Sequence, residues 1–86
     1  MQKTKTTVKI AGRDYNISGT DSPEYVRRVA AYVDRKMGEI SLAARLQPID
    51  LAVLTAVNCA DDMMKSRDEI RFLKQRIAEL EGNKDA

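Results

Sequence analysis

PIDLAVLTAVNCADDMMKSRDEIRFLKQRIAELE, residues 48–81, is a stretch without glycine and without proline after its first residue. Proline suits the first turn of a helix, and the Gly82-Asn83 pair that follows is typical of a helix end. One continuous helix over this stretch would be ~50 Å long at ~1.5 Å per residue, much longer than so small a domain needs. The length predicts a helix that leaves its own domain and forms a coiled coil.

Apolar residues recur along this helix with a heptad period. Positions a are Ile49, Ala56, Met63, Ile70 and Ile77, and positions d are Ala52, Cys59, Ser66, Leu73 and Leu80. In the first half a second apolar stripe widens the face, so that this half can pack against another helix of the head and another chain at once; it comprises Val53, Leu54, Val57, Ala60 and Met64. In the second half only a narrow seam remains, Ile70, Leu73, Ile77 and Leu80, which only a second copy or a partner helix can bury.

Phe72 lies beside the seam, at position c, and favours an assembly wider than a two-stranded zipper. A pair of dimers would bury it, although the small or polar d residues Cys59 and Ser66 leave the number of chains open. The predicted oligomerisation residues are Ile49, Ala52, Ala56, Cys59, Met63, Ile70, Phe72, Leu73, Ile77 and Leu80.

The chain before residue 48 predicts a small head. Residues 6–10 and 15–17 alternate between apolar and polar side chains, which is typical of a β-hairpin. A type II′ turn at Gly12-Arg13 would pair Ile10 with Tyr15, and Val8 with Ile17, on one apolar face. A two-stranded hairpin is marginal in water, so this face needs a cover.

A helix is predicted to provide that cover from Pro23 to about Ile40, with Ser22 or Asp21 as its N-cap. The predicted fold is therefore α+β, a dimer of dimers. Its head is residues 1–47, with a hairpin at about 6–18, a helix at about 23–40 and a connection at 41–47. The long helix follows at 48–81, its first half in the head and its second half in the coiled coil, and residues 82–86 form a frayed tail.

The residue inventory excludes most catalytic chemistry. The chain has no histidine and one cysteine, so it offers neither an imidazole base, nor a Cys/His zinc site, nor an intrachain disulfide. No phosphate-binding or nucleophile motif is present. We predict a protein that is not an enzyme and holds no cofactor or metal.

Charge and hydropathy indicate where such a protein works. Residues 1–47 carry nine Lys and Arg against five Asp and Glu, whereas residues 48–86 carry six against eight, which favours an acidic partner for the head. Residues 1–7 lack the apolar region of a signal peptide, and no apolar run approaches membrane-spanning length. A cytoplasmic protein without a membrane partner is expected.

Four segments in order resemble the ZapA family of bacterial cell-division proteins. They are residues 8–17 (VKIAGRDYNI), 21–26 (DSPEYV), 30–37 (AAYVDRKM) and 51–61 (LAVLTAVNCAD), and the likeness extends over roughly residues 6–80. The resemblance implies a protein at the division site, at mid-cell, that binds polymers of FtsZ, the tubulin-like GTPase of the division ring, and bridges its filaments. It also implies dimers that pair through antiparallel coiled coils into tetramers with heads at both ends.

Arg13 is the first candidate for the FtsZ contact, because it lies at a turn tip and matches the Gly-Arg turn of the family. Arg45, in the connection, is the second. Lys9, Arg35 and Lys36 follow, although a solubilising charged face is the stronger interpretation for these three.

Two further residues of the long helix receive structural interpretations. Asn58 interrupts an apolar stretch, so we expect it to bond backbone in the head or across the dimer. Cys59 is interpreted as a small apolar residue rather than a redox centre.

Two other functions remain open. A generic coiled-coil adaptor for another partner is one alternative to the function that the resemblance implies. A nucleic-acid binder is suggested by Arg27-Arg28, Arg35-Lys36 and a pI of 8.8, but the interspersed acidic residues and a net charge of only +2 disfavour it.

Overall fold

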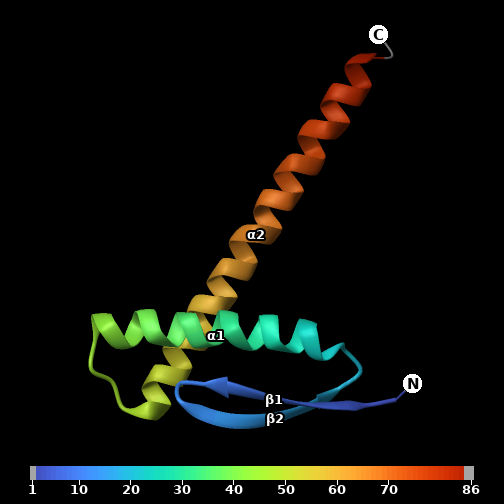
Figure 1. Cartoon of the computed structure of the whole chain (residues 1–86). Helices are drawn as coiled ribbons and strands as arrows, with labels where there is room; N and C mark the ends of the chain where they lie inside the picture. Colours follow the sequence, from blue (N-terminus) through green and yellow to red (C-terminus); the bar gives the residue numbers. More distant parts are fainter. Residues whose placement is uncertain (1, 85–86) are drawn as a thin grey trace.

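The computed structural model describes residues 2–84 of the chain. Two strands, β1 (Thr4–Ile10) and β2 (Arg13–Gly19), precede two helices, α1 (Pro23–Ala43) and α2 (Pro48–Lys84). This order is visible in Figure 1. The predicted α+β class, a hairpin followed by a short and a long helix, is confirmed.

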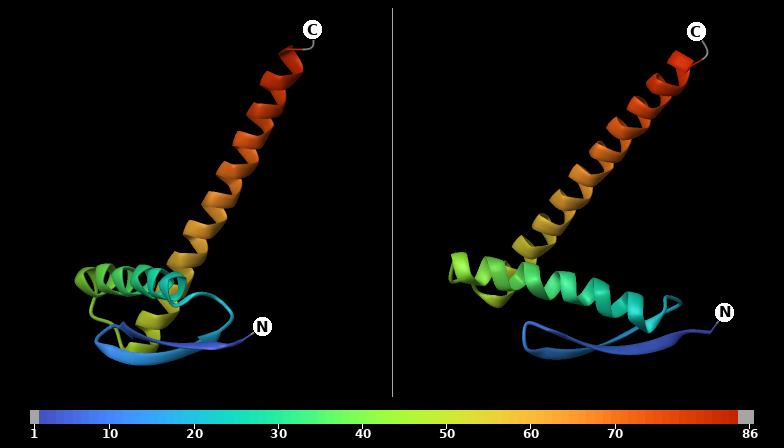
Figure 2. Two further views of the ribbon diagram at one scale, coloured as in Figure 1. Left: turned by 45° about the vertical axis from the view of Figure 1, so that its right-hand side comes forward. Right: turned by 45° about the horizontal axis from the view of Figure 1, so that its top comes forward.

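The elements form a small head from which one helix projects. The hairpin lies along one side of α1, the first turns of α2 lie beside both, and the rest of α2 extends away alone in all three views (Figures 1 and 2). The chain measures 58 × 40 × 14 Å. Its radius of gyration is 18.4 Å, whereas a compact domain of this length would have about 12 Å.

The register of the hairpin differs from the prediction. Val8 pairs with Tyr15 and Ile10 with Arg13, so the predicted pairing of Ile10 with Tyr15 was wrong by two residues. The two-residue turn is Ala11-Gly12 rather than Gly12-Arg13. Because side chains alternate with a period of two, this shift keeps the predicted apolar side chains on one face.

The turn explains the shift. Ala11 and Gly12 have φ values of 52° and 78°, the pattern of a type I′ turn, which needs positive φ at both central residues. Alanine rarely takes this conformation, but here its N–H donates to Asp34 Oδ1 of α1 at 2.8 Å. A contact from another element therefore selects the turn.

Helix α1 begins as predicted and ends later. Ser22 is the N-cap, because its hydroxyl oxygen accepts the N–H of Tyr25 at 3.2 Å, and Pro23 opens the first turn. The helix ends at Ala43 rather than near Ile40. Residues 40–43 include no proline or glycine that would break a helix. Pro48 restricts only the residue directly before it and therefore does not end the helix at residue 40.

Helix α2 also runs past its predicted end. It continues through Gly82 to Lys84 rather than ending near residue 81, and residues 85–86 of the predicted frayed tail lie outside the described part. Glycine lowers helix propensity by only about 1 kcal/mol and ends a helix chiefly where it turns left-handed.

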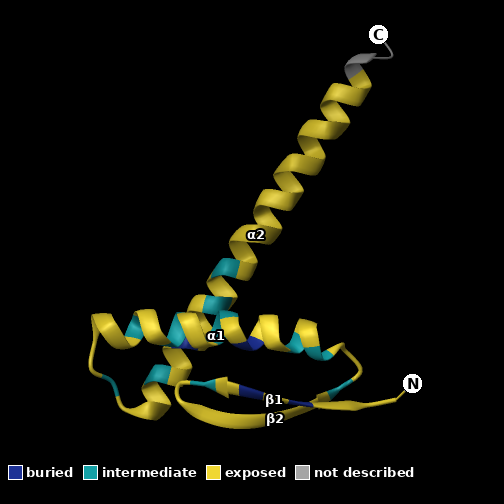
Figure 3. Ribbon diagram, viewed as in Figure 1, coloured by how far each residue is buried: buried dark blue, intermediate teal, exposed yellow. Residues whose placement is uncertain are grey.

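The core is minimal. Among the described residues only Val8, Ala30, Thr6 and Thr55 are buried; Thr6 and Val8 belong to β1, Ala30 to α1 and Thr55 to α2 (Figure 3). The chain exposes 7448 Å², whereas a compact monomer of this mass would expose about 5100 Å². A single copy therefore leaves unusually much surface in water.

Within residues 2–84 neither helix alone combines the length and the apolar composition needed to cross a membrane. Taken together, α1 and residues 48–82 of α2 pass that test of length and composition, but they meet at a bend of 118°.

Candidate functional site

Two of the predicted basic residues lie at the end of the head where the hairpin turn faces the connection between the helices. Arg13 opens β2 and lines an open hollow of about 350 Å³ with Leu46 and Pro48, so it lies against the connection between the helices. Arg45 is exposed in that same connection, residues 44–47. We call Arg13 and Arg45 the basic tip; within residues 2–84 neither forms a salt bridge.

Lys9 and Arg35 lie elsewhere. Lys9 is exposed opposite Asp14, and it alternates with buried Val8, so it is on the hairpin face turned away from α1. Arg35 is exposed on α1, with its guanidinium 5.2 Å from the ring centre of Tyr32 and a loose 3.9 Å pair with Glu39. The five predicted contact residues therefore do not form one patch.

Lys36 is engaged inside the chain. Its ammonium lies 2.6 Å from Oδ2 of Asp62 on α2, and its side chain is only 17% exposed. The hydroxyl of Tyr32, one turn earlier on α1, donates to the same carboxylate oxygen. Tyr32, Lys36 and Asp62, the Asp62 cluster, thus join the two helices.

The contacts within the Asp62 cluster stabilise the charged pair. The hydrogen bonds from Lys36 and then from Tyr32 lower the pKa of Asp62 below its usual value. The hydrogen bond to Asp62 raises the pKa of Lys36 and also that of Tyr32. All three groups keep their ordinary protonation at neutral pH.

Sequence reasoning missed Asp62, although the sequence holds a signal for it. Asp62 follows Leu51, Thr55 and Cys59 at helical spacing, and these four residues are the less exposed side of α2, here called the inner stripe. Thr55 is buried, and its hydroxyl donates to the carbonyl of Leu51 at 2.7 Å. Apart from Leu51, the side of α2 facing the head is therefore small or polar, and the other large apolar side chains of this half point elsewhere.

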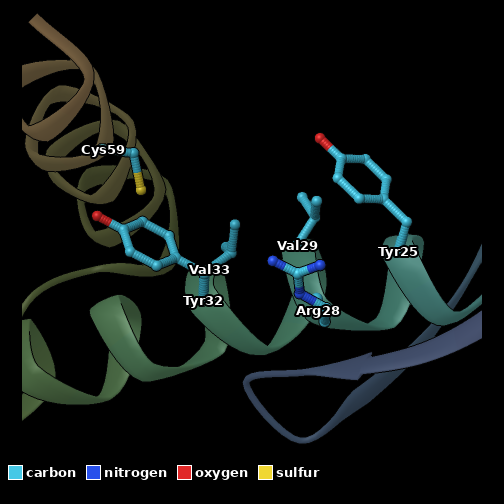
Figure 4. Close-up of a pocket in the computed structure, with 6 residues that line it drawn as sticks. All are labelled: Tyr25, Arg28, Val29, Tyr32, Val33 and Cys59. Atoms are coloured by element: carbon cyan, nitrogen blue, oxygen red, sulfur yellow. The ribbon is translucent and has the colours of Figure 1, made fainter. Parts of the chain in front are cut away.

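A hollow of about 420 Å³ opens between the helices (Figure 4). Its lining residues are Tyr25, Arg28, Val29, Tyr32, Val33 and Cys59. Cys59 extends from α2 toward Tyr32 of α1, so this predicted oligomerisation residue lies against the head of its own chain (Figure 4). Asn58 beside it is exposed, and its amide donates to the carbonyl of Leu54 on its own helix at 3.2 Å.

The projecting part of α2 exposes its apolar side chains. Every residue from 63 to 82 is exposed, and each seam side chain keeps half or slightly more of its surface in water. Of the other predicted oligomerisation residues, Ile49, Met63 and Phe72 are also exposed, as are Ala52 and Ala56. Nothing within residues 2–84 shelters the seam.

Known proteins resemble this chain along nearly its whole length. The profile of the family "Cell division protein ZapA" matches residues 6–84. A cell division protein ZapA of Halalkalibacterium halodurans is 47% identical over 76 residues, which cover 87% of this chain and 84% of that relative. One of Geobacillus thermodenitrificans is 43% identical over 84 residues, covering 96% and 92%.

A solved structure agrees with these relatives. It is described as a ZapA mutant dimer from Geobacillus stearothermophilus, and it superimposes with a TM-score of 0.69 at 42% sequence identity. The match covers 90% of this chain and 91% of that one.

Proposed function

The chain belongs to the ZapA family of cell division proteins, and on this premise we propose that it binds FtsZ polymers and cross-links them into bundles that stabilise the division ring. The observation that carries the proposal is the projecting half of α2, whose seam is half exposed and has no shelter within residues 2–84. A head at the end of an associating helix is the shape that a cross-linker needs.

Self-association is the first part of the proposal. Burying the seam requires a second copy or a partner helix, and the similar solved structure, which is described as a dimer, supports a second copy. Exposed Phe72 beside the seam supports a further pairing of dimers into a tetramer. With the helices antiparallel, such a tetramer carries heads at both ends.

The basic tip is the proposed contact with an acidic surface of FtsZ. Arg13 and Arg45 come from separate segments, lie at the same end of the head and are exposed. Lys9 and Arg35 are secondary candidates on other faces. Lys36 is proposed to act inside the head instead, because Asp62 already neutralises it.

Multivalency allows weak contacts between single heads and FtsZ to hold filaments together. Each head binds weakly, but heads joined through one assembly gain about 10²–10⁴ in avidity without any new contact. The proposed site of action is therefore the cytoplasmic FtsZ polymer at mid-cell, where many binding sites lie side by side.

Co-sedimentation with FtsZ in GTP and in GDP tests the proposal. We expect the full chain to pellet with GTP polymers and to bundle them, and a chain ending at residue 64 to bind poorly and not to bundle. Bundling by the shortened chain at the level of the full chain would contradict the role of the seam. No pelleting of the full chain at modest salt would favour an adaptor for another partner.

Arg13→Ala with Arg45→Ala tests the basic tip. If each arginine makes one charge-assisted contact of about 1 kcal/mol, the double substitution should weaken binding about 30-fold. Arg71→Ala is the matched control, because Arg71 is an exposed arginine paired only loosely, at 3.6 Å, with Asp68 of α2. Equal binding by the double variant and this control would exclude the tip as the contact.

A further inference from the structure

Asp62 is the last attachment between α2 and the head. The inner stripe ends with it, and every residue from 63 to 82 is exposed. In the described part of the chain, the only side-chain hydrogen bonds or salt bridges between α1 and α2 are those that Asp62 receives from Tyr32 and Lys36.

The attachment at Asp62 holds α2 at a second point besides the connection at residues 44–47, so the two points together restrain the direction of the helix. Tyr32 and Lys36 lie one turn apart, about 6 Å along α1, and both reach Oδ2 of Asp62. The ring of Tyr32 is rigid, and it also lies 5.6 Å from the Lys36 ammonium. Two donors separated along one helix and converging on one oxygen of the other fix where α2 crosses α1.

The packing near this crossing restrains it only weakly. The two residues that directly precede Asp62 on the inner stripe, Thr55 and Cys59, have short side chains, the larger Leu51 lies about three turns before Asp62, and an open hollow lies between the helices. Short side chains bury little apolar area, so packing alone resists a swing of α2 poorly.

We propose that Asp62 is the positioning residue that fixes the direction in which α2 leaves the head. The consequence for function rests on the proposed cross-linking of FtsZ: the direction of α2 would set how the basic tips at the two ends of an assembly face, and hence the spacing of bundled filaments.

The length of α2 amplifies small changes at the cluster. Gln75 lies about 20 Å beyond Asp62, so a swing of about 15° at the cluster would displace it by about 5 Å. A displacement of this size is measurable by pulsed electron paramagnetic resonance between two spin labels.

The test places labels on cysteines at exposed Arg27 of α1 and at Gln75 of α2, in full-length protein carrying Cys59→Ala. Labelled chains are diluted with unlabelled chains, so that only the distance within one chain is measured. Asp62→Ala should shift or broaden the distance distribution by about 5 Å, the displacement worked above. Tyr32→Phe, which removes one of the two donors, should give a smaller change in the same direction.

Asp61→Ala is the matched control. Asp61 is the neighbouring residue with the same charge, but it pairs with Lys65 of its own helix at 2.9 Å and not with α1. We expect its distribution to equal that of the parent. If Asp62→Ala proves unfolded by circular dichroism, Tyr32→Phe decides, and equal distributions for Tyr32→Phe, Asp61→Ala and the parent overturn the proposal.

Electron microscopy of FtsZ bundles tests the consequence separately. Asp62→Ala should still pellet with FtsZ, since the basic tip is intact, but its bundles should show more variable filament spacing than those of Asp61→Ala. The spin-label distances involve no FtsZ, so they decide the role of Asp62 even if the wild-type chain fails to pellet.

Discussion

Replacing Leu73 and Ile77 together with alanine should weaken self-association by about three orders of magnitude. Both side chains belong to the seam, and they are 50% and 54% exposed in a single chain. Alanine has the highest helix propensity, so the substitutions remove apolar surface without breaking the helix. The expected loss therefore comes from the interface.

The magnitude follows from the exposed fractions. Each substitution removes three carbon groups, worth about 2.4 kcal/mol when fully buried, and the half still exposed in one chain is worth about 1.2 kcal/mol. Two substitutions in each of two chains then cost about 5 kcal/mol, and each 1.4 kcal/mol is about a tenfold change in the dissociation constant.

Sedimentation equilibrium over a concentration series measures this change, and circular dichroism of the same samples checks that the helix is retained. Gln75→Ala is the control, because it lies on the same helix outside the seam and should associate like the wild type. If the double variant also associates like the wild type while remaining helical, the seam is not the interface. A wild-type chain that stays monomeric at micromolar concentration would contradict the proposed assembly as a whole.

Three further predictions concern the head. Ser22→Ala should lower the free energy of unfolding by about 1 kcal/mol, since it removes the N-cap of α1, and urea denaturation would show this. Asp34→Ala should lower stability by about 1 kcal/mol through the lost bond to Ala11, whereas Ala11→Gly should raise it by a similar amount, because glycine takes positive φ without strain; both would appear as opposite shifts of the melting temperature. The stability difference between wild type and Asp62→Asn should be constant near neutrality. The difference should shrink as pH falls below about 4, because a lowered pKa of Asp62 adds stability only above the pKa of the unfolded state. It should also shrink as pH rises above about 10.4, because a raised pKa of Lys36 adds stability only while the ammonium stays protonated. Urea titrations at several pH values would show both changes.

Local rules predicted the elements better than their pairing. The periodicity of α1 and α2 and the Ser22-Pro23 start were readable because these signals depend on neighbouring residues. The hairpin register was not, because a local rule assigns the positive φ to glycine alone. Ala11 takes it with help from Asp34, which lies 23 residues further along the chain.

The same limit applies to the candidate site. Arg13 and Arg45 were predicted one by one, and the fold places them at the same end of the head. The engagement of Lys36 was not predictable, because its partner Asp62 depends on where two helices cross. Only the helical spacing of Thr55 and Asp62 indicated a polar inner side.

The heptad pattern extends along all of α2, but in the structure its first part faces the head of the same chain and its second part projects into solvent. The d residues Ala52 and Cys59 line hollows formed with the hairpin or α1 of their own chain. A partner helix following the seam toward the head would therefore meet α1 near Asp62. From there to the end of α2 at Lys84 the proposed coiled coil would extend over only about 33 Å. So short a zipper would bury few side chains, and we therefore expect exposed apolar groups outside the seam, such as Phe72 and Val57, to supply further contacts in the proposed assembly.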